Sequence, residues 1–207
     1  MATTTRTADP IQVRKASTAD VPRIATTLAA AFFDDPVFRW TCPDERRRRE
    51  LLPAFFSLIA ETLQQHDEIH LAGDGTGAAL WLPPGQPPVP EDQAEAFGRR
   101  LEEIAGADAE RVFAISKLID EHHPPGSYYF LQFIAVEPTS QGRRIGSMLL
   151  AHMLERCDRE GVPAYLDATS PHNKRLYERH GFRAGSQYAP QGGPPLWPMW
   201  REPRAER

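Results

Sequence analysis

The sequence has little cysteine and no long hydrophobic run. Its 207 residues include two cysteines, Cys42 and Cys157, which lie far apart and outside any metal-ligand spacing. This excludes a disulfide framework, and we expect both thiols to be reduced and structural. No apolar run is long enough to span a bilayer, and the N-terminal segment MATTTRTADP lacks the apolar core of a signal peptide. We therefore expect a cytoplasmic protein with no membrane partner.

An excess of positive charge is also absent, because the formal net charge is −4 at pH 7. Binding to the phosphates of nucleic acid needs a basic face, so no nucleic-acid partner is expected. The basic run ERRRRE, residues 45–50, is flanked by glutamates and is typical of a solvated helix face. No pair of histidines or cysteines has the spacing of metal ligands, so no metal is expected either.

What the chain does have is an alternation of strand-like and helix-like segments, without an internal repeat or a linker. With 41% hydrophobic and 25% charged residues, it can bury a full core as one domain. Strands are expected at residues 11–15, 68–72, 78–82, 128–136, 164–168, 182–188 and 196–201. Helices are expected at residues 21–32 and 52–63, twice within 91–121, at 145–157 and shortly after 171, with a break or kink at Pro53. The pattern predicts one α/β domain over residues 1–207 with a mixed sheet, in which residues 1–9 form a flexible N-terminal segment.

The segment from residue 128 to residue 157 has the arrangement of an anion site. YYFLQFIAV, residues 128–136, is rich in aromatic and β-branched residues and is too short for a globular helix, so it indicates a buried strand. After the polar turn SQGRRIGS, apolar residues recur at helical spacing. The first turn of such a helix offers unpaired N–H groups and the positive end of its dipole, which favours phosphate. No Gly-Lys-Ser/Thr follows, so a nucleoside triphosphatase is excluded.

Two motifs in this half of the chain resemble those of one superfamily. QGRRIG, residues 141–146, is preceded by Val-x-Pro and resembles the acetyl-CoA pyrophosphate loop of the GNAT N-acetyltransferases, Gln/Arg-x-x-Gly-x-Gly/Ala. NKRLYERHGF, residues 173–182, resembles the downstream GNAT motif with its asparagine, tyrosine and Gly-Phe pair. Segments 20–36, 161–173 and 192–203 are also similar to the puromycin N-acetyltransferase branch. The resemblance implies an α+β GNAT fold: a central mixed, mostly antiparallel sheet of six to seven strands with helices on both faces.

The resemblance also implies a reaction and a set of residues. The expected activity is transfer of acetyl from acetyl-CoA to the amine of a small molecule, such as a puromycin-like or other amino-containing antibiotic, by direct attack on the thioester. Tyr177 would lie near the sulfur as general acid, because a phenol with a reference pKa of about 10 keeps its proton at neutral pH. Without the motif, Tyr177 would be interpreted as ordinary core. The implied acetyl-CoA residues are Ile134, Ala135, Val136, Gln141, Gly142, Arg143, Arg144, Ile145, Gly146, Ser147, Asn173 and Tyr177.

One position departs from the superfamily pattern. Glycine is expected where Arg144 stands, because the backbone approaches the pyrophosphate closely there. A right-handed helical backbone at Arg144 would need no glycine, provided that the side chain points away from the cofactor. We therefore expect the loop to bind acetyl-CoA through backbone N–H groups, with Arg143 and Arg144 adding positive charge.

The general base is less clearly marked. Some relatives carry a titratable histidine at the position of Gln132, and glutamine cannot accept a proton. Asp167 stands on the next strand, where related sequences often carry glutamate, so it is the first candidate. Two alternatives stay open: a carboxylate that only orients the loop, and a reaction without a dedicated base, in which the amine arrives partly neutral.

The acceptor side is expected at the loop between the first two helices, as in relatives. Aromatic residues beside carboxylates suit a cationic, partly apolar amine, whereas Asp35 better fits a turn with a solvated acid. Peptide or protein acetylation, which prefers an open groove, and a non-catalytic acyl-CoA-binding module remain as alternatives, and both a monomer and a homodimer fit. The predicted substrate-binding residues are Phe32, Asp34, Trp40, Tyr129 and Gln132.

Overall fold

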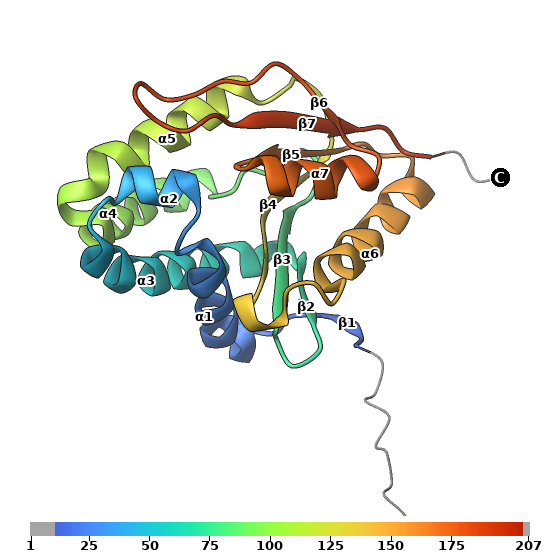
Figure 1. Cartoon of the computed structure of the whole chain (residues 1–207), viewed down its shortest axis with the longest axis horizontal. Helices are drawn as coiled ribbons and strands as arrows, with labels where there is room; N and C mark the ends of the chain where they lie inside the picture. The colour runs from blue at the N-terminus through green and yellow to red at the C-terminus, as the bar shows by residue number, and fades with distance from the viewer. Residues whose placement is uncertain (1–10, 205–207) are drawn as a thin grey trace, which may run out of the picture.

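The computed structural model describes residues 11–204, and these residues form a seven-stranded sheet with helices on both faces (Figure 1). The expected flexible segment at residues 1–9 lies outside the described residues. The strand order is β1-β2-β3-β4-β5-β7-β6, and every neighbouring pair is antiparallel except β4 and β5. This confirms the mixed, mostly antiparallel sheet. The strands are β1 Val13–Lys15, β2 Ile69–Ala72, β3 Gly77–Leu82, β4 Tyr129–Val136, β5 Ala164–Ala168, β6 Arg183–Ala184 and β7 Trp197–Arg201.

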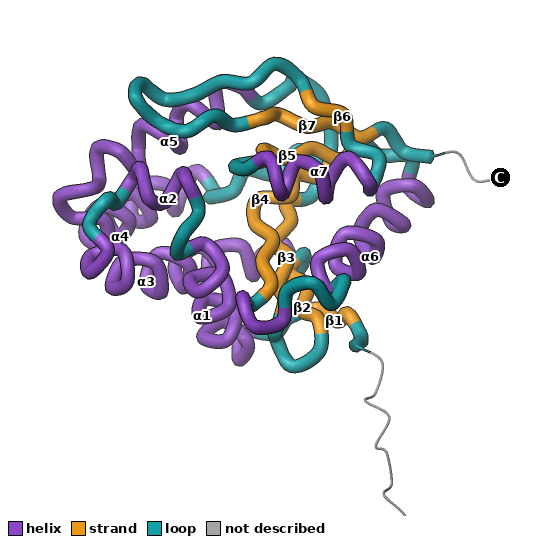
Figure 2. Tube along the Cα trace, viewed as in Figure 1, coloured by secondary structure: helices purple, strands orange, loops and turns teal. Residues whose placement is uncertain are grey.

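The helices divide between the two faces of the sheet (Figure 2). Helices α1 (Val21–Phe32) and α3 (Glu45–Leu63) pack on one face around a large apolar core, and α4 (Ala94–Ala105) and α5 (Ala109–His122) extend this layer. The short α2 (Pro36–Thr41) joins α1 to α3. Helices α6 (Ile145–Glu160) and α7 (Pro171–Arg179) lie over the other face, around a second core. Within the described chain, none of the helices combines the length and the apolarity that crossing a membrane requires.

Helix α3 runs through Pro53 without a break, so of the expected break or kink the break is wrong. Proline removes one hydrogen bond and frees the carbonyl four residues earlier, here that of Arg49. Both Pro53 and Arg49 are exposed, so water can satisfy the freed carbonyl. The buried side of the helix, which includes Leu52, Phe56 and Ile59, then holds the chain helical through tertiary packing.

The sheet opens between its two parallel strands. Strands β4 and β5 pair only at Tyr129 with Ala164 and at Phe130 with Tyr165, and they separate beyond these residues. The edge of β4 that faces β5 is therefore unpaired towards its C-terminal end, while its other edge stays bonded to β3. This opening positions the site described below.

A bulge in β4 changes which side chains face the opening. Phe133 stands opposite Leu80 and Leu131 opposite Trp81, so the extra residue is Gln132. Because side chains alternate along a strand, one extra residue places Gln132 and Phe133 on the same side of the sheet.

The two C-terminal strands are shorter than expected. Strand β6 has two residues, and Tyr188 pairs with Leu196 only as an isolated bridge. Prolines at 190, 194 and 195 lack the N–H that a ladder requires, so pairing cannot extend through this segment.

Candidate active site

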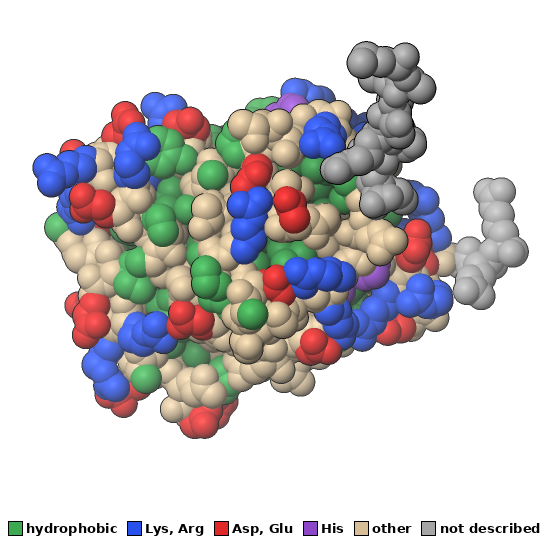
Figure 3. All heavy atoms as spheres, turned by 90° about the horizontal axis from the view of Figure 1, so that it is seen from below, with side chains coloured by type: hydrophobic (Ala, Val, Ile, Leu, Met, Phe, Trp, Pro, Cys, Tyr) green, Lys and Arg blue, Asp and Glu red, His purple; other side chains and the backbone are tan. Residues whose placement is uncertain are grey.

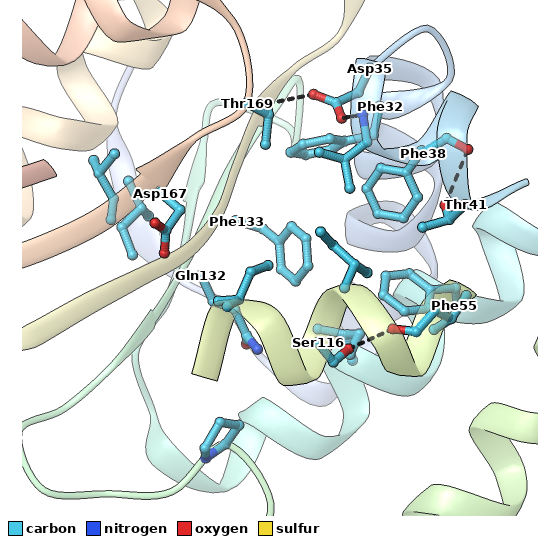
Figure 4. Close-up of a pocket in the computed structure, with 18 of the residues that line it drawn as sticks. Phe32, Asp35, Phe38, Thr41, Phe55, Ser116, Gln132, Phe133, Asp167 and Thr169 are labelled. Atoms are coloured by element: carbon cyan, nitrogen blue, oxygen red, sulfur yellow. Dashed lines mark hydrogen bonds between the residues drawn. The ribbon is translucent and has the colours of Figure 1, made fainter. Parts of the chain in front are cut away.

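A cavity of about 390 Å³ lies beneath the opening between β4 and β5, enclosed by residues of α1 to α5 (Figure 4). Its wall is largely apolar and includes several phenylalanines. The rings of Phe32 and Phe38 meet edge to face with centroids 5.5 Å apart, and the ring of Phe133 lies 5.7 Å from Phe32 and 6.3 Å from Phe55. An enclosed, mostly apolar cavity with a few polar groups is the usual form of a small-molecule site. Of the predicted substrate residues, Phe32 and Gln132 line it.

Asp167 projects from β5 into this cavity (Figure 4). Its Oδ1 accepts hydrogen bonds from the hydroxyls of Tyr165 at 3.0 Å and Tyr188 at 2.8 Å. Its Oδ2 is buried and has no partner among the described residues. Burial raises the pKa of Asp167 to about 6, in spite of the two hydroxyl bonds. A carboxylate with that pKa and a free buried oxygen can accept a proton near neutral pH.

Gln132 supplies a second free acceptor from the bulge in β4. Its side-chain oxygen is buried and has no partner within residues 11–204. Gln132 and Asp167 both line the cavity, from the two strands that separate. An amine bears N–H donors that suit such oxygens, and leaving them unpaired costs free energy.

The sequence suggested that Asp34 contacts substrate and that Asp35 is a solvated turn residue, but the structure places Asp35 at the cavity and Asp34 in solvent. Asp35 begins α2, accepting the N–H of Val37 at 2.9 Å and the hydroxyl of Thr169 at 2.5 Å, and it lines the cavity. Burial raises the pKa of Asp35. Asp34 is exposed and is not part of the cavity wall, so its predicted contact with substrate is not supported by this placement. The N-cap geometry before Pro36 turns the second carboxylate inward.

Tyr177 lies on α7 and is 6% exposed. It lines the cavity together with Asn173, one turn earlier on the same helix. Burial raises the pKa of Tyr177, so its phenol keeps its proton across the neutral range. Ser170 is the N-cap of α7, and its hydroxyl accepts the N–H of Asn173 at 3.2 Å. This cap stabilises the first turn of the helix, where Asn173 lines the cavity.

The loop between β4 and α6 has two residues with left-handed backbone, Gly142 with φ +78° and Arg144 with φ +63°. The expected right-handed conformation at Arg144 is therefore wrong. Arg144 is the N-cap of α6, and the chain must reverse there to enter the helix, which is why relatives favour glycine. A left-handed backbone costs a residue with a Cβ roughly 1 kcal/mol. The side chains of Arg143 and Arg144 are both exposed.

The start of α6 has the features of a phosphate site. Met148 donates its N–H to the carbonyl of Arg144 at 3.0 Å, so the N–H groups of Ile145, Gly146 and Ser147 precede the first N–H that donates within the helix. A Cβ added to Gly146 would lie 3.7 Å from Val136 and Leu176, an ordinary contact that leaves room for alanine but little more. The loop is tied to β4 through the side-chain N–H of Gln141, which donates to the carbonyl of Val136 at 3.2 Å.

The end of β4 connects this loop to the cavity. Ile134 lines the cavity, and Ala135 and Val136 follow it towards the loop. Since β5 has left this edge of β4, the backbone groups of the edge are open to a ligand, apart from the Val136 carbonyl, which accepts from Gln141. An extended, amide-containing chain such as pantetheine fits this edge as an added strand would, with the pyrophosphate at the start of α6. The residues present therefore fit acetyl-CoA.

Two predicted substrate residues lie elsewhere. Tyr129 points to the opposite face of the sheet, where its hydroxyl donates to Glu160 of α6 at 2.7 Å. The alternation of β4 gives the cavity position to its neighbour, Phe130. Trp40 packs outside the cavity wall, with the guanidinium of Arg111 5.6 Å from its ring centroid. Both predictions are corrected by the direction of the side chain on its element.

Sequence reasoning also missed several members of the site. Phe55 and Phe133 appeared only as part of apolar patterns, and Tyr188 lies in a proline-rich segment with no motif of its own. Thr169 follows β5 inside the segment that drew attention for Asp167, which is the one signal that pointed towards it. In the described chain, no group of three or more His, Cys, Asp or Glu side chains is arranged to hold a metal ion.

Comparison with known proteins gives a consistent result. The sequence profile of the acetyltransferase (GNAT) family matches residues 88–182. An uncharacterised N-acetyltransferase of Schizosaccharomyces pombe is 28% identical over 206 residues, covering 90% of this chain and 81% of that protein. A Corynebacterium glutamicum structure described as histone acetyltransferase HPA2 and related acetyltransferase is 28% identical, with a TM-score of 0.72 over 95% of this chain and 98% of that one.

A more distant structure shares the fold alone. The polyamine N-acetyltransferase of Drosophila melanogaster is 18% identical, with a TM-score of 0.57 over 93% of this chain and 100% of that one. The matched profile spans β4, the left-handed loop, α6, β5 and α7, which include Gln132, Asp167 and Tyr177, whereas α1 to α3 lie outside the matched residues. GNAT enzymes take their acyl group from acetyl-CoA. Here the open edge of β4 suits its pantetheine arm, and the start of α6 suits its pyrophosphate. The chain is therefore similar in sequence and fold to N-acetyltransferases of the GNAT family.

Proposed function

We propose that this enzyme transfers acetyl from acetyl-CoA to the primary amine of a small molecule with a bulky apolar body. The observation that carries the proposal is the meeting of Asp167, Tyr177 and the open edge of β4 at one aromatic cavity. Aromatic walls bind the apolar body of the acceptor, and the free oxygens of Asp167 and Gln132 receive its N–H groups.

The open edge of β4 and the start of α6 hold the donor. Backbone groups of Ile134 and Val136 pair with the pantetheine amides and polarise the thioester carbonyl, while those of Ala135, between them, point to the β3 edge of the strand. The N–H groups from Gly142 to Ser147 bind the pyrophosphate, and Arg143 and Arg144 add positive charge near it. Asn173 contacts the donor from α7, beside Tyr177.

In the reaction, Asp167 takes one proton from the acceptor ammonium, and the neutral amine attacks the thioester carbonyl. A C–N bond forms, and the C–S bond breaks. Tyr177 gives its proton to the departing sulfur and regains one from the nitrogen that becomes the amide. The net products are the N-acetylated amine, CoA with a free thiol, and one proton that Asp167 releases to water.

Two observations bear on which amine is the acceptor. The cavity is enclosed by α1 to α5, and this favours a small molecule over a peptide, which would need an open groove. Fold relatives include an enzyme named arylalkylamine N-acetyltransferase from Aedes aegypti. Puromycin has an aromatic side chain beside its free amine, so it belongs to the class that we propose.

The test is CoA release from acetyl-CoA across a panel of amines. We expect arylalkylamines and puromycin to give higher kcat/KM than a linear polyamine, an aminoglycoside or an N-terminal peptide. A preference for the peptide would contradict the small-molecule proposal. Strong thermal stabilisation by acetyl-CoA, with no CoA release for any amine, would instead identify a binding module.

The role of Tyr177 is tested by Tyr177→Phe. We expect kcat to fall about a hundredfold at every pH, because a general acid contributes a factor of that order, while the KM for acetyl-CoA changes little. Steady-state kinetics at several pH values measure both constants. A kcat within about twofold of the unmodified enzyme would show that another group, or water, protonates the sulfur.

A further inference from the structure

Two phenols hold Asp167, and the reaction proposed above does not use either of them. Tyr165 stands two residues earlier on β5, on the same face as Asp167, and Tyr188 follows β6. Both hydroxyls donate to the same oxygen, Oδ1, at 3.0 and 2.8 Å. The other oxygen, Oδ2, is buried and accepts nothing from the described residues. One oxygen of the carboxylate is therefore occupied twice while the other is open.

Neither phenol is free to move away. Tyr165 is 2% exposed, and its ring lies 5.4 Å from the ring of Tyr128 and 5.7 Å from that of Phe130, centroid to centroid. Tyr188 is fixed by two backbone hydrogen bonds to Leu196, at 3.0 and 2.7 Å, and its ring stacks on His122 at a centroid distance of 3.9 Å. Rigid donors from two separate segments determine the orientation of the carboxylate.

We propose that Tyr165 and Tyr188 are positioning residues that hold Asp167 by Oδ1 and thereby aim Oδ2 at the acceptor amine in the cavity. Both phenols bond to the carboxylate, and neither is among the residues that line the cavity. A carboxylate that could rotate would offer its lone pairs to the amine only part of the time, and fixing it removes that loss.

The same bonds determine the pH range in which Asp167 is a base. Burial disfavours the carboxylate form and raises its pKa, whereas each hydroxyl bond favours that form and lowers the pKa. The other titratable groups that act on Asp167 are His122 of α5 and Tyr128, which precedes β4, and Asp120 of α5 faces Tyr188. None of these three donates a hydrogen bond to Asp167 within the described structure. Loss of either phenol should therefore move the pKa of Asp167 upward.

The test uses Tyr165→Phe and Tyr188→Phe, with a direct and a kinetic readout. ¹³C NMR of the aspartate carboxyl carbons, assigned with Asp167→Asn, should show the Asp167 midpoint rising by about one pH unit in each variant. The acid limb of kcat, measured with saturating arylalkylamine, should move by the same amount. Activity should then fall about fivefold at pH 6 but hardly at pH 8. A general loss of structure would instead lower kcat at both pH values.

The matched control is Tyr129→Phe, which removes a phenol–carboxylate bond of the same kind, to Glu160, on the opposite face of the sheet. We expect its acid limb to keep the midpoint of the unmodified enzyme. Unchanged NMR midpoints in both cavity-side variants would overturn the positioning of Asp167, and shifted NMR midpoints with an unshifted acid limb would overturn its catalytic meaning.

This inference rests on the proposed function for its catalytic meaning, and the two can fail separately. Shifted NMR midpoints in a protein that acetylates no amine would support the positioning while contradicting the proposed function. Turnover with an acid limb that survives in Asp167→Asn would leave the acetyltransferase activity in place and overturn the role of Asp167 and of its two phenols.

Discussion

At the scale of single residues, Arg144 combines a conformational cost with a position that suits its charge. Its backbone is left-handed at the start of α6, where glycine would be unstrained. Its exposed guanidinium lies in the loop that we propose binds pyrophosphate. These two effects oppose each other in any substitution, and they can be measured separately.

We predict that Arg144→Gly stabilises the fold and weakens the binding of acetyl-CoA. Relief of the left-handed backbone should raise the free energy of unfolding by up to about 1 kcal/mol, which a thermal melt detects. Loss of one charge near the phosphates should raise the KM for acetyl-CoA severalfold at low salt and reduce its salt dependence. The control is Arg143→Gly, which removes the same charge where φ is not positive, and it should be neutral or destabilising. An unchanged KM for Arg144→Gly would make the arginine a bystander.

Besides its proposed role as base, Asp167 affects the stability of the fold. Its pKa is raised in the folded state, so folding favours the protonated form. Its stabilising effect is complete below the unfolded pKa of about 4 and is lost as the pH rises through the folded pKa near 6. At neutral pH, the buried carboxylate therefore costs stability.

We predict that Asp167→Asn changes the free energy of unfolding more favourably at pH 7.5 than at pH 4. The effect of the substitution at pH 7.5 should exceed its effect at pH 4 by about 2 kcal/mol. Urea unfolding at the two pH values measures this difference between variants, so that other carboxyl groups cancel. A difference that is equal at both pH values would mean that the pKa of Asp167 is not raised by folding.

At the scale of elements, α3 shows how tertiary packing overrides local preference. Proline in a helix interior is unfavourable by about 3 kcal/mol relative to alanine, yet α3 continues through Pro53 over 19 residues. Apolar spacing correctly predicts this helix, whereas the break expected at Pro53 does not occur. Burial of one face of α3 keeps the chain helical at Pro53, and this burial depends on tertiary contacts that the local sequence does not show.

We predict that Pro53→Ala stabilises the protein by about 1 to 3 kcal/mol, because it restores the hydrogen bond to the carbonyl of Arg49 and removes the clash of the ring. Pro22→Ala is the matched control, since Pro22 lies in the first turn of α1, where its missing N–H has no helical partner. Chemical denaturation of both variants gives the comparison. Equal effects at the two prolines would contradict this explanation.

The strands β4 and β5 were predicted as elements, but their relationship was not. Their apolar runs predict buried strands, and the observed β4 and β5 confirm this. The bulge at Gln132 and the early separation of the two strands depend on pairing with β3 and on the helices packed around them. These two irregularities create the opening and bring Gln132 and Phe133 to it, and they also direct Tyr129 away.

At the scale of the whole molecule, the cavity brings together segments that are distant along the chain. The hydroxyl of Thr169 reaches Asp35 across 134 positions, and the aromatic wall combines α1, α2, α3 and β4. The space-filling view of the molecule from below shows positive and negative side chains interspersed on that face (Figure 3). Under the proposed function, the acceptor is recognised in the cavity that these segments form together.

We predict that Phe55→Leu shifts acceptor preference towards bulkier amines. The smaller side chain enlarges the cavity while keeping its wall apolar. The kcat/KM for amines with two rings should therefore rise several-fold relative to that for amines with one ring. The substitution should also cost about 1 to 2 kcal/mol of stability, because Phe55 is buried. The control is Phe113→Leu, because Phe113 is exposed and outside the cavity wall. An equal preference for two-ring over one-ring amines in both variants would contradict the assignment of the cavity as the acceptor site.

The sequence by itself determined the order of strands and helices, the glycine-containing loop at the start of α6 and the Asn-to-Gly-Phe motif around Tyr177. These follow from local patterns, in which apolar spacing and turn residues act within a few positions. Only the tertiary structure decided that Asp35 rather than Asp34 enters the cavity, that Arg144 is left-handed, and that Tyr165 and Tyr188 converge on Asp167. Each of these depends on the direction of a side chain relative to a distant segment, and such directions are fixed only when the sheet and its helices pack together.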